Sequence, residues 1–363
     1  MPKSGKFLLI GSTEAYSGKS AAVLGLAHLL KEKQLDIAYG KPVGTCWSND
    51  RNDGTDEDVK FLADSLNLPP NRLLKTFLFL DVPTIEKRLR GEDRINYRAL
   101  LAESSQMELG ELILLEGPGT LDEGSLFEMS LLETAEVVDA SILLVARLES
   151  VLSVHKILSA KQRLGDRLSG VLLNDIPHDQ LEVLQTEVTP FLENRNIPVL
   201  GILPRSALLR SVSVKELVHQ LSAEVICRGD RLDLMVESLK IGAMNVNSAL
   251  KYFRKGRNMA VVTGGDRPDI QLAALETSTQ CLILTGHVSP PDFILSRAED
   301  LEIPILSVDL DTLTTVEIIN HTFGQVRLQE PAKVQCICQM MAQHFDIDRA
   351  IEKLGLKTAV TQP

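Results

Sequence analysis

A glycine, a lysine and a serine near the start of the chain have types and spacing that suit phosphate chemistry. The stretch from Gly11 to Ser20 reads Gly-Ser-Thr-Glu-Ala-Tyr-Ser-Gly-Lys-Ser. In such a loop, backbone N–H groups and the positive end of the following helix dipole hold phosphates. The lysine reaches the β- and γ-phosphates, and the serine hydroxyl lies on Mg²⁺. We therefore expect a Mg-ATP site formed by Gly11, Thr13, Ser17, Gly18, Lys19 and Ser20.

The loop departs from the usual pattern of glycine, four residues and Gly-Lys-Ser or Gly-Lys-Thr. Thr13 stands where the first glycine would be, and the nearest glycine is Gly11. A plain strand-to-helix turn with an exposed Lys19 is the alternative. The apolar runs on both sides of the loop, at 7–10 and 21–30, favour a nucleotide site.

The elements that would position this loop alternate between strand-like and helix-like segments over the first 205 residues. Short, nearly continuous apolar runs predict strands at 7–10, 37–39, 112–115, 141–145, 170–173 and 199–202. Helical patterns lie at 18–33, 56–66, 97–110, 154–166 and 179–194. This alternation predicts an α/β fold of the P-loop NTPase type, with a mostly parallel sheet flanked by helices.

Ligands of such sheets bind at the carboxyl ends of the strands, and several predicted strands end in suitable residues. Lys41, Glu116, Asn174 and Pro204 each follow a different strand. An acidic residue facing a phosphate loop suits the second side of Mg²⁺, so Glu116 is a candidate metal ligand with Ser20. An exposed loop carboxylate is the alternative interpretation of Glu116.

An acidic group, Asp53, Asp56, Glu57 and Asp58, precedes the predicted helix at 56–66. Acidic residues in a first helical turn cap the helix and complement its dipole. Asp56 or Asp58 equally suits Mg²⁺ ligation, and the sequence leaves both interpretations open.

Composition excludes several classes of protein. The 363 residues suggest two or three domains, and the net charge of −11 with only 4% aromatic residues disfavours nucleic-acid binding. The apolar run near the start is too short for a signal peptide, and no run suits a membrane helix. We expect a cytoplasmic protein without membrane insertion.

Three motifs together resemble the dethiobiotin-synthetase-like family. They are the loop at 11–20, Tyr-Gly-Lys-Pro-Val-Gly at 39–44 and Glu-Gly-Pro-Gly at 116–119. That family includes the N-terminal domain of long phosphotransacetylases and is related to cobyrinic acid a,c-diamide synthases. The resemblance implies that Lys19 and Lys41 act on the phosphates or a substrate, that Asp58 or Asp56 and Glu116 complete the metal site, and that Asn174 faces the adenine.

One departure argues against the synthetase activity itself. The family's loop after the acidic residue is usually Gly-Ala-Gly-Gly, whereas here it is Gly-Pro-Gly-Thr. Pro118 fixes φ and removes an N–H donor, so we do not expect the diamine substrate. A phosphotransacetylase catalytic region, which the resemblance would place after these domains, is not expected within the sequence.

The second half repeats the α/β alternation on a smaller scale. The string Thr263-Gly264-Gly265-Asp266-Arg267-Pro268, with a later Leu-Thr-Gly at 284–286, resembles the DRTGG domain, which implies a regulatory or dimerising module. Asp266 and Arg267 either pair across the turn, bind an anion or fix a turn at a dimer interface. The second domain's ligand would be a small molecule or nucleotide, and we expect a homodimer or larger homo-oligomer.

The predicted organisation is a nucleotide-binding domain at 1–210, a DRTGG-like domain at 215–325 and a C-terminal helix with its tail at 326–363. His28, on an apolar helix, is expected to be a packed core residue.

Two functions follow from these patterns. One is a Mg-ATP-binding regulatory protein that modulates a metabolic or signalling partner. The other is an ATP-dependent ligase or carboxylase that acts through an acyl or carbamoyl phosphate. A partition-type ATPase is disfavoured because positions 12–17 hold no lysine.

Overall fold

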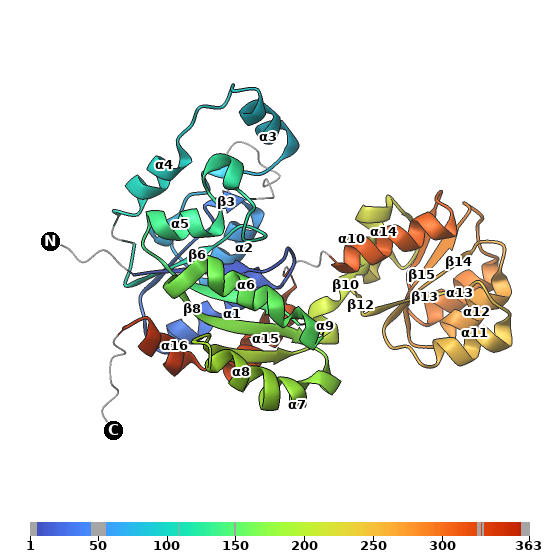
Figure 1. Cartoon of the computed structure of the whole chain (residues 1–363). Helices are drawn as coiled ribbons and strands as arrows, with labels where there is room; N and C mark the ends of the chain where they lie inside the picture. Colours follow the sequence, from blue (N-terminus) through green and yellow to red (C-terminus); the bar gives the residue numbers. More distant parts are fainter. Residues whose placement is uncertain are drawn as a thin grey trace. The chain divides into compact units, whose positions relative to one another are not determined.

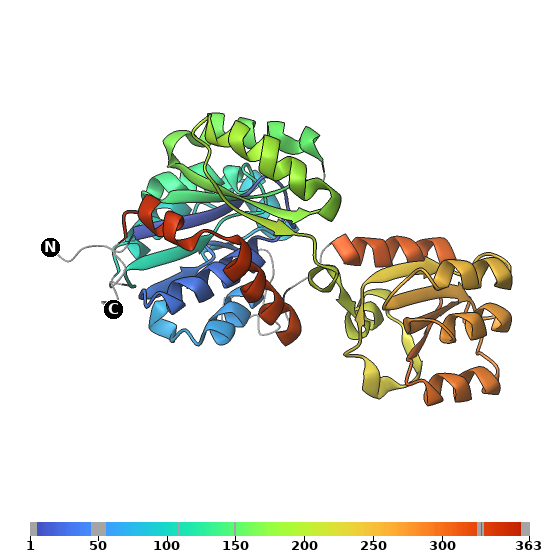
Figure 2. The same cartoon turned by 90° about the horizontal axis from the view of Figure 1, so that it is seen from below.

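The computed structural model describes residues 6–44, 56–107, 109–148, 150–324, 328 and 330–356. The chain divides into two compact units (Figures 1 and 2). Unit 1 is Met1–Arg205 with Leu328–Pro363, and unit 2 is Ser206–Arg327. The segment 326–363 was expected as a separate C-terminal helix and tail, whereas its described helices belong to unit 1. Asp53 lies outside the described residues.

The centre of unit 1 is a parallel sheet of seven strands in the described residues, in the order β4-β2-β6-β1-β7-β8-β9. Its strands are β1 (Lys6–Ser12), β2 (Ile37–Gly40), β4 (Leu73–Leu74), β6 (Leu112–Glu116), β7 (Ser141–Arg147), β8 (Leu168–Ile176) and β9 (Val199–Pro204). Leu9 of β1 lies opposite Leu115 of β6 on one side and Ile142 of β7 on the other. The predicted α/β fold with a mostly parallel sheet is confirmed.

Helices cover both faces of this sheet. They are α1 (Lys19–Glu32), α2 (Glu57–Leu66), α3 (Val82–Leu89), α4 (Tyr97–Ser104), α5 (Leu131–Val137), α6 (Val154–Leu164), α7 (Leu181–Val183), α8 (Thr189–Glu193), α15 (Pro331–His344) and α16 (Ile347–Lys353). Several differ from expectation: α3 was not predicted, α4 ends six residues before the predicted end at 110, and a π-helical turn at Leu184–Val188 interrupts the helix predicted over 179–194. The single helix expected at the C-terminus is two, α15 and α16. Strands β3 (Val43–Gly44) and β5 (Leu78–Phe79) form a separate, two-stranded parallel sheet.

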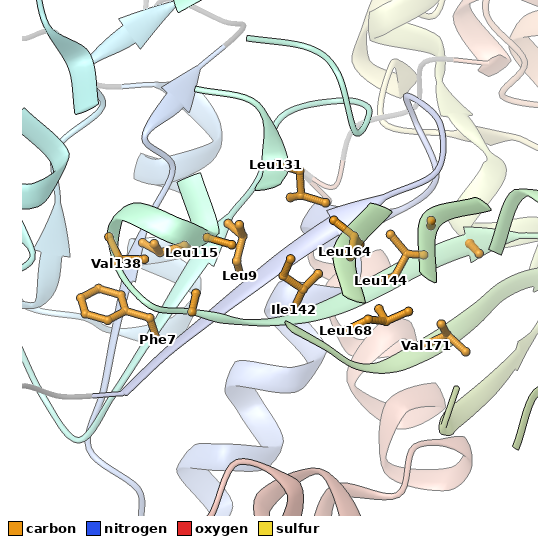
Figure 3. Close-up of a cluster of buried hydrophobic side chains, with 14 of the residues drawn as sticks. Phe7, Leu9, Leu115, Leu131, Val138, Ile142, Leu144, Leu164, Leu168 and Val171 are labelled. Carbon is orange, nitrogen blue, oxygen red and sulfur yellow. The ribbon is translucent and has the colours of Figure 1, made fainter. Parts of the chain in front are cut away.

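Alternating side chains of the strands build two cores. Leu9, Leu115, Ile142 and Leu144 point to one face, where they meet Leu131 of α5 and Leu164 of α6 (Figure 3). Every one of these side chains is buried. Burial on both faces explains why the strands are apolar almost without interruption.

The opposite face is covered partly by the end of the chain. Helix α15 packs along α1, and Gly25 of α1 makes room for Met341, since a Cβ there would overlap that side chain. Phe345 forms a bridge with Gly201 of β9, and the Arg349 guanidinium pairs with both oxygens of Glu193 at 2.7 and 2.8 Å. The red helices beside the blue α1 in Figure 2 are this segment.

His28 is not a core residue, contrary to expectation. Its side chain is 47% exposed and lies 3.4 Å from Glu32, one turn further along α1. The other residues from Ala21 to Leu30 are buried, so His28 is the one exposed position in this part of α1.

Unit 2 is a second α/β layer around a five-stranded sheet in the order β11-β16-β15-β14-β13. The strands of this sheet are β11 (Glu224–Cys227), β13 (Ser238–Ile241), β14 (Met259–Gly264), β15 (Thr279–Thr285) and β16 (Ile305–Val308). A separate antiparallel pair is formed by β10 (Val212–Ser213) and β12 (Met235–Val236). The helices of unit 2 are α9 (Ala207–Arg210), α10 (Val214–Leu221), α11 (Val246–Phe253), α12 (Pro268–Leu275), α13 (Asp292–Asp300) and α14 (Thr312–Gly324). All pairings in the five-stranded sheet are parallel except β11 with β16.

Among the described residues, no helix is both long and apolar enough to cross a membrane.

Candidate functional site

The Gly-Lys-Ser loop joins the carboxyl end of β1 to the first turn of α1, as predicted. Gly18 precedes the helix in a left-handed conformation (φ 91°), which glycine adopts without strain. Its Cα faces the amide of Asn174, so any Cβ at this position would overlap that side chain. The loop geometry therefore requires a glycine at position 18.

Lys19 lies within the loop. Its Nζ donates to the Ser12 hydroxyl at 3.2 Å, and Ser12 in turn donates to the Gly119 carbonyl at 2.8 Å. Burial lowers the pKa of the Lys19 ammonium, although the nearby Glu116 carboxylate acts in the opposite direction. The ammonium thus contacts a neutral hydroxyl oxygen, and the Glu116 carboxylate lies close enough to affect its pKa.

Ser20, Glu116 and Tyr39 form a buried polar group next to Lys19. The Ser20 and Tyr39 hydroxyls donate to the two oxygens of Glu116 at 2.8 and 3.0 Å. Glu116, the last residue of β6, is only 3% exposed, so its interpretation as an exposed loop carboxylate is wrong. Burial raises the pKa of Glu116, although the Lys41 ammonium opposes this effect.

Lys41 lies between two of the predicted acidic residues. Its Nζ contacts Asp56 at 3.1 Å and Asp58 at 2.6 Å. Burial works against the Lys41 ammonium, but Glu116, Asp58 and Asp56 together outweigh it and raise the pKa of Lys41 above its ordinary value. Asp56 also accepts a hydrogen bond from the Asp58 N–H at 2.9 Å, so it does cap α2.

The remaining predicted residues of unit 1 also lie at this edge of the sheet. Asn174 of β8 donates to the Ser17 carbonyl at 2.8 Å, and Pro204 ends β9 opposite Ile176. Gly11 lies near the end of β1, where a Cβ would overlap Leu131. The hydroxyls of Thr13 and Ser17 are buried and have no hydrogen-bond partner among the described residues.

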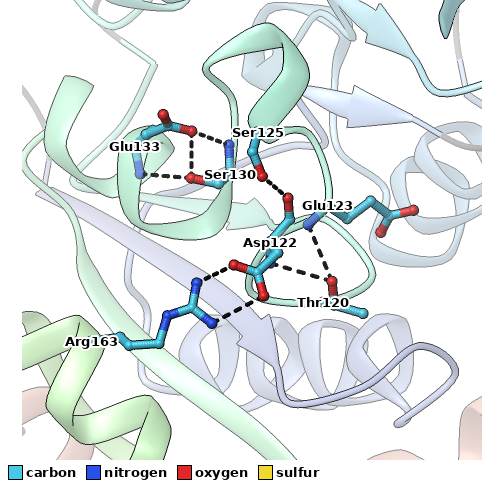
Figure 4. Close-up of polar contacts among 7 residues, drawn as sticks. All are labelled: Thr120, Asp122, Glu123, Ser125, Ser130, Glu133 and Arg163. Atoms are coloured by element: carbon cyan, nitrogen blue, oxygen red, sulfur yellow. Dashed lines mark hydrogen bonds and ion pairs between the residues drawn. The ribbon is translucent and has the colours of Figure 1, made fainter.

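The loop that follows Glu116 is fixed by its own polar contacts (Figure 4). Asp122 pairs with both terminal nitrogens of Arg163, and the Thr120 hydroxyl accepts from the N–H groups of Asp122 and Glu123. Ser130 and Glu133 form a reciprocal capping box at the start of α5. Gly117, Pro118 and Gly119 thus sit between β6 and an anchored turn.

The donor set suits a hard cation. Mg²⁺ prefers oxygen ligands, keeps several waters and takes one or two carboxylates, so Ser20 with Glu116 fits it. The two orphaned hydroxyls of Thr13 and Ser17 give the same loop unused hydrogen-bonding capacity for phosphate oxygens. Within the described residues, no group of three or more histidine, cysteine or acidic side chains forms a metal cluster.

The predicted residues of unit 2, 263–267, form the end of β14 and the turn that follows it, and the polar contacts of Thr263 and Arg267 go to neighbouring segments of the same unit. Thr263 donates to the Gly242 carbonyl at 3.1 Å. Arg267 pairs with Asp269 at 3.1 Å, so the expected ion pair across the turn forms with Asp269 rather than with Asp266. The reason is local, since Arg267 lies just before α12 and Asp269 in its first turn.

Sequence reasoning missed two residues at these edges. Tyr39, fully buried, holds Glu116, and its place at the end of the second apolar strand was the available signal. Gln271, also fully buried, donates to the carbonyls of Gly264 and Gly265, both at 3.0 Å. A polar residue inside the apolar pattern of α12 was the signal there.

A parallel sheet with a Gly-Lys-Ser loop at its carboxyl edge and an acidic residue ending the neighbouring strand defines a P-loop α/β domain. The model of a family described as an AAA domain matches residues 6–213, more than half of the chain, and the chain belongs to that family. A DRTGG domain model matches residues 216–322. The dethiobiotin-synthetase-like P-loop domain followed by a DRTGG domain is thereby confirmed, an arrangement found in the N-terminal part of phosphate acetyltransferases.

Similar proteins include two named phosphate acetyltransferase. The one from Synechocystis sp. is 27% identical over 311 residues, which cover 81% of this chain and 44% of that protein. The one from Nitratidesulfovibrio vulgaris is 25% identical over 361 residues, covering 93% of this chain and 50% of that protein. The chain therefore spans about half the length of these relatives.

Solved structures give weaker matches. The CBS and DRTGG domains of a Clostridium perfringens pyrophosphatase, complexed with diadenosine tetraphosphate, align with a TM-score of 0.29 at 21% identity, over 42% of this chain and 80% of that one. Chloroplast FtsY from Physcomitrella patens aligns with a TM-score of 0.37 at 13% identity, over 56% of this chain and 59% of that one.

Proposed function

We propose that unit 1 binds Mg-ATP and that the chain is a regulatory protein whose nucleotide state modulates a metabolic or signalling partner. One observation supports this most directly: Lys19, Ser20 and Glu116 meet at the start of α1, with Glu116 buried and accepting from Ser20. Burying a carboxylate lowers the stability of the folded protein, because the charge loses its hydration. Binding of a metal ion by Glu116 would offset this loss.

In this proposal each residue has a defined task. Ser20 and Glu116 hold Mg²⁺, which neutralises phosphate charge when it is bound. Lys19 leaves the Ser12 hydroxyl and binds the β- and γ-phosphates, while Asp58 or Asp56 supplies a further oxygen on the metal side. The loop backbone and the hydroxyls of Thr13 and Ser17 donate to the remaining phosphate oxygens. Asn174 and Pro204 border the base.

The regulatory role rests on the combination of domains. The matched relatives are named as enzymes, and the chain corresponds to the N-terminal, non-catalytic half of their length. The DRTGG domain would then receive the signal, through a small-molecule or nucleotide ligand of its own or through pairing in a homodimer. Thr263, Gly264, Gly265, Asp266 and Arg267 are the proposed contact residues.

An ATP-dependent ligase is the second candidate. It is favoured by Lys41, a second cation close enough to Glu116 for that carboxylate to raise its pKa. Lys41 would stabilise a transferring phosphoryl group together with Lys19. Its two carboxylate partners, Asp56 and Asp58, make this assignment weaker than the regulatory one, because Lys41 is already neutralised.

The test is calorimetric titration of Mg-ATP into the full chain, with Lys19→Ala and a matched control, Lys161→Ala. Lys161 lies on α6 and pairs with Asp166. Losing a charge-assisted contact of about 2 kcal/mol should weaken ATP binding about 30-fold in Lys19→Ala and not in Lys161→Ala. Equal affinities in all three proteins would refute the site. ADP release that a metabolite extract stimulates, and that Lys19→Ala abolishes, would instead identify a ligase.

A further inference from the structure

The chain crosses between its two units twice, after Arg205 and again before Leu328. On the unit 1 side, the first crossing continues directly from β9. On the same side, the second crossing is followed by α15, which packs on α1. Both crossings therefore begin on elements of the P-loop domain, and the residues that anchor them can be followed back to the loop.

Arg205, the last residue before the first crossing, is fixed to the end of β8. Its backbone N–H donates to the Ile176 carbonyl at 2.7 Å, and its Nε contacts the Asp175 carboxylate at 3.1 Å. Asp175 also pairs with Arg147 at 2.9 Å, and its own backbone is left-handed (φ 58°). Aspartate tolerates this conformation but does not prefer it, so the position is held by its surroundings.

The residue before Asp175 is fixed to the P-loop. The Asn174 amide donates to the Ser17 carbonyl at 2.8 Å, and the same amide borders the Cα of Gly18. Ser17 is fully buried, and its hydroxyl has no partner among the described residues. A continuous set of contacts thus runs from Ser17 through Asn174 and Asp175 to Arg205.

The returning segment attaches to the same strand. Phe345 bridges Gly201 of β9, and the Asp346 N–H donates to the Leu200 carbonyl at 2.7 Å. The strand that leads out to unit 2 is therefore held at its end by β8 and along its length by the segment that comes back.

We propose that Asn174, Asp175 and Arg205 form a relay that couples occupation of the P-loop to the connection entering unit 2. The inference rests on the proposed nucleotide function. A phosphate that recruits the Ser17 hydroxyl and the Gly18 N–H reorients the Ser17 peptide, whose carbonyl Asn174 holds. Asn174 must follow or lose its hydrogen bond, and because Asp175 is the next residue, a shift of Asn174 would move the carboxylate that holds Arg205. Coupling between sites requires an element with two arrangements, and the proposal assigns that role to this strand end.

The experiment compares amide hydrogen exchange of residues 206–213 in the full chain, with and without saturating Mg-ATP, for wild type, Arg205→Ala and Arg147→Ala. Arg147→Ala is the matched control, because it also removes a guanidinium from Asp175, but one that lies on β7 rather than at the crossing to unit 2. We expect Mg-ATP to change exchange in this segment about fivefold or more in wild type and in Arg147→Ala. Arg205→Ala should bind ATP with an affinity within about twofold of wild type but show no such change.

The outcomes separate the relay from the nucleotide function, because ATP affinity is measured on the same samples. ATP binding without any exchange change at 206–213 in wild type would overturn the relay alone. A full change in Arg205→Ala would overturn it as well. Absence of ATP binding to wild type would overturn the nucleotide function and the relay with it.

Discussion

Both units place polar residues at the carboxyl ends of parallel strands. The buried ones in unit 1 include charged side chains, whereas those described in unit 2 are uncharged. At the edge of unit 1, Lys41, Asp56 and Glu116 are each at most 4% exposed. The described polar side chains that are buried to a similar degree in unit 2 are uncharged: Ser211, Thr263, Gln271, Thr279, Thr285, Ser307, Thr315 and Thr322.

This difference separates two uses of buried polar groups. The hydroxyls and amide of unit 2 are bonded largely to backbone carbonyls, as with Thr263 on Gly242 and Gln271 on Gly264, and they fix turns. Buried ion pairs, by contrast, often add little net stability compared with apolar packing. Their presence at the edge of unit 1 supports a ligand site there, whereas the buried Thr263 and Gln271 of unit 2 mainly hold the backbone of the turn after β14.

The largest expected effect comes from removing the Lys41 ammonium, which pairs with Asp56 and Asp58 at the edge of unit 1. Lys41→Met removes the ammonium that pairs with the fully buried Asp56, and breaking a buried pair in this way costs about 3–5 kcal/mol. Urea unfolding, with segment-resolved hydrogen exchange to assign the loss to unit 1, measures this change.

The matched change in unit 2 is Gln271→Leu. It deletes a buried neutral group and leaves the carbonyls of Gly264 and Gly265 without its amide, at a cost of about 1–3 kcal/mol. A larger loss for Gln271→Leu than for Lys41→Met would reverse the comparison between the units.

A second, smaller effect concerns Glu116. Because burial raises its pKa in the folded protein, the neutral acid is favoured there. The associated stability is present below the ordinary glutamate pKa and is lost as pH rises through the raised value. Glu116→Gln is always neutral, so its free energy of unfolding should exceed that of wild type increasingly as pH rises over this range.

Titration of both proteins with urea between pH 4 and pH 9 tests this expectation. If the proposed function holds, Mg²⁺-dependent ATP affinity should fall in the same variant, because an amide replaces the carboxylate proposed to ligate Mg²⁺. Parallel stability curves for Glu116→Gln and wild type would show that the buried carboxylate costs the fold nothing.

The parallel sheet was predictable because its central strands are buried on both faces and so consist of uninterrupted apolar runs. Strand β4, Leu73–Leu74, was not, since two residues carry no periodicity. The edge strand β11 was missed for a different reason: three of its four residues are not fully buried, so it lacks the long apolar run that marks the central strands.

The site was predictable in residue type but not in pairing. Glu116 and Ser20 were found because each ends or begins an element at the carboxyl edge of the sheet. That Lys41 meets Asp56, or that Asn174 holds Ser17, depends on how side chains pack in three dimensions across 15 and 157 residues of sequence. The return of α15 and α16 to unit 1 was missed likewise, because an apolar stripe predicts burial without indicating the partner.

The smallest expected effect lies on the surface of unit 1, where that returning segment is held by Arg349 and Glu193. The hydrogen bond from Arg349 lowers the pKa of Glu193, so its stabilising contribution is present above the ordinary glutamate pKa and is lost as pH falls through the lowered value. Both side chains are about one-third exposed, and solvent screening limits the pair to about 1 kcal/mol.

Arg349→Ala should therefore reduce the free energy of unfolding by up to about 1 kcal/mol at pH 7 and have little effect near pH 3. Lys33→Ala is the matched control. Its pair with Asp348 on the same helix has one bond at 2.6 Å, and Asp348 is 74% exposed, so its removal should cost less. Urea unfolding of both variants at the two pH values makes the comparison. An Arg349→Ala cost that persists at pH 3 would mean that packing of the arginine stem, rather than its charge, holds α16 against unit 1.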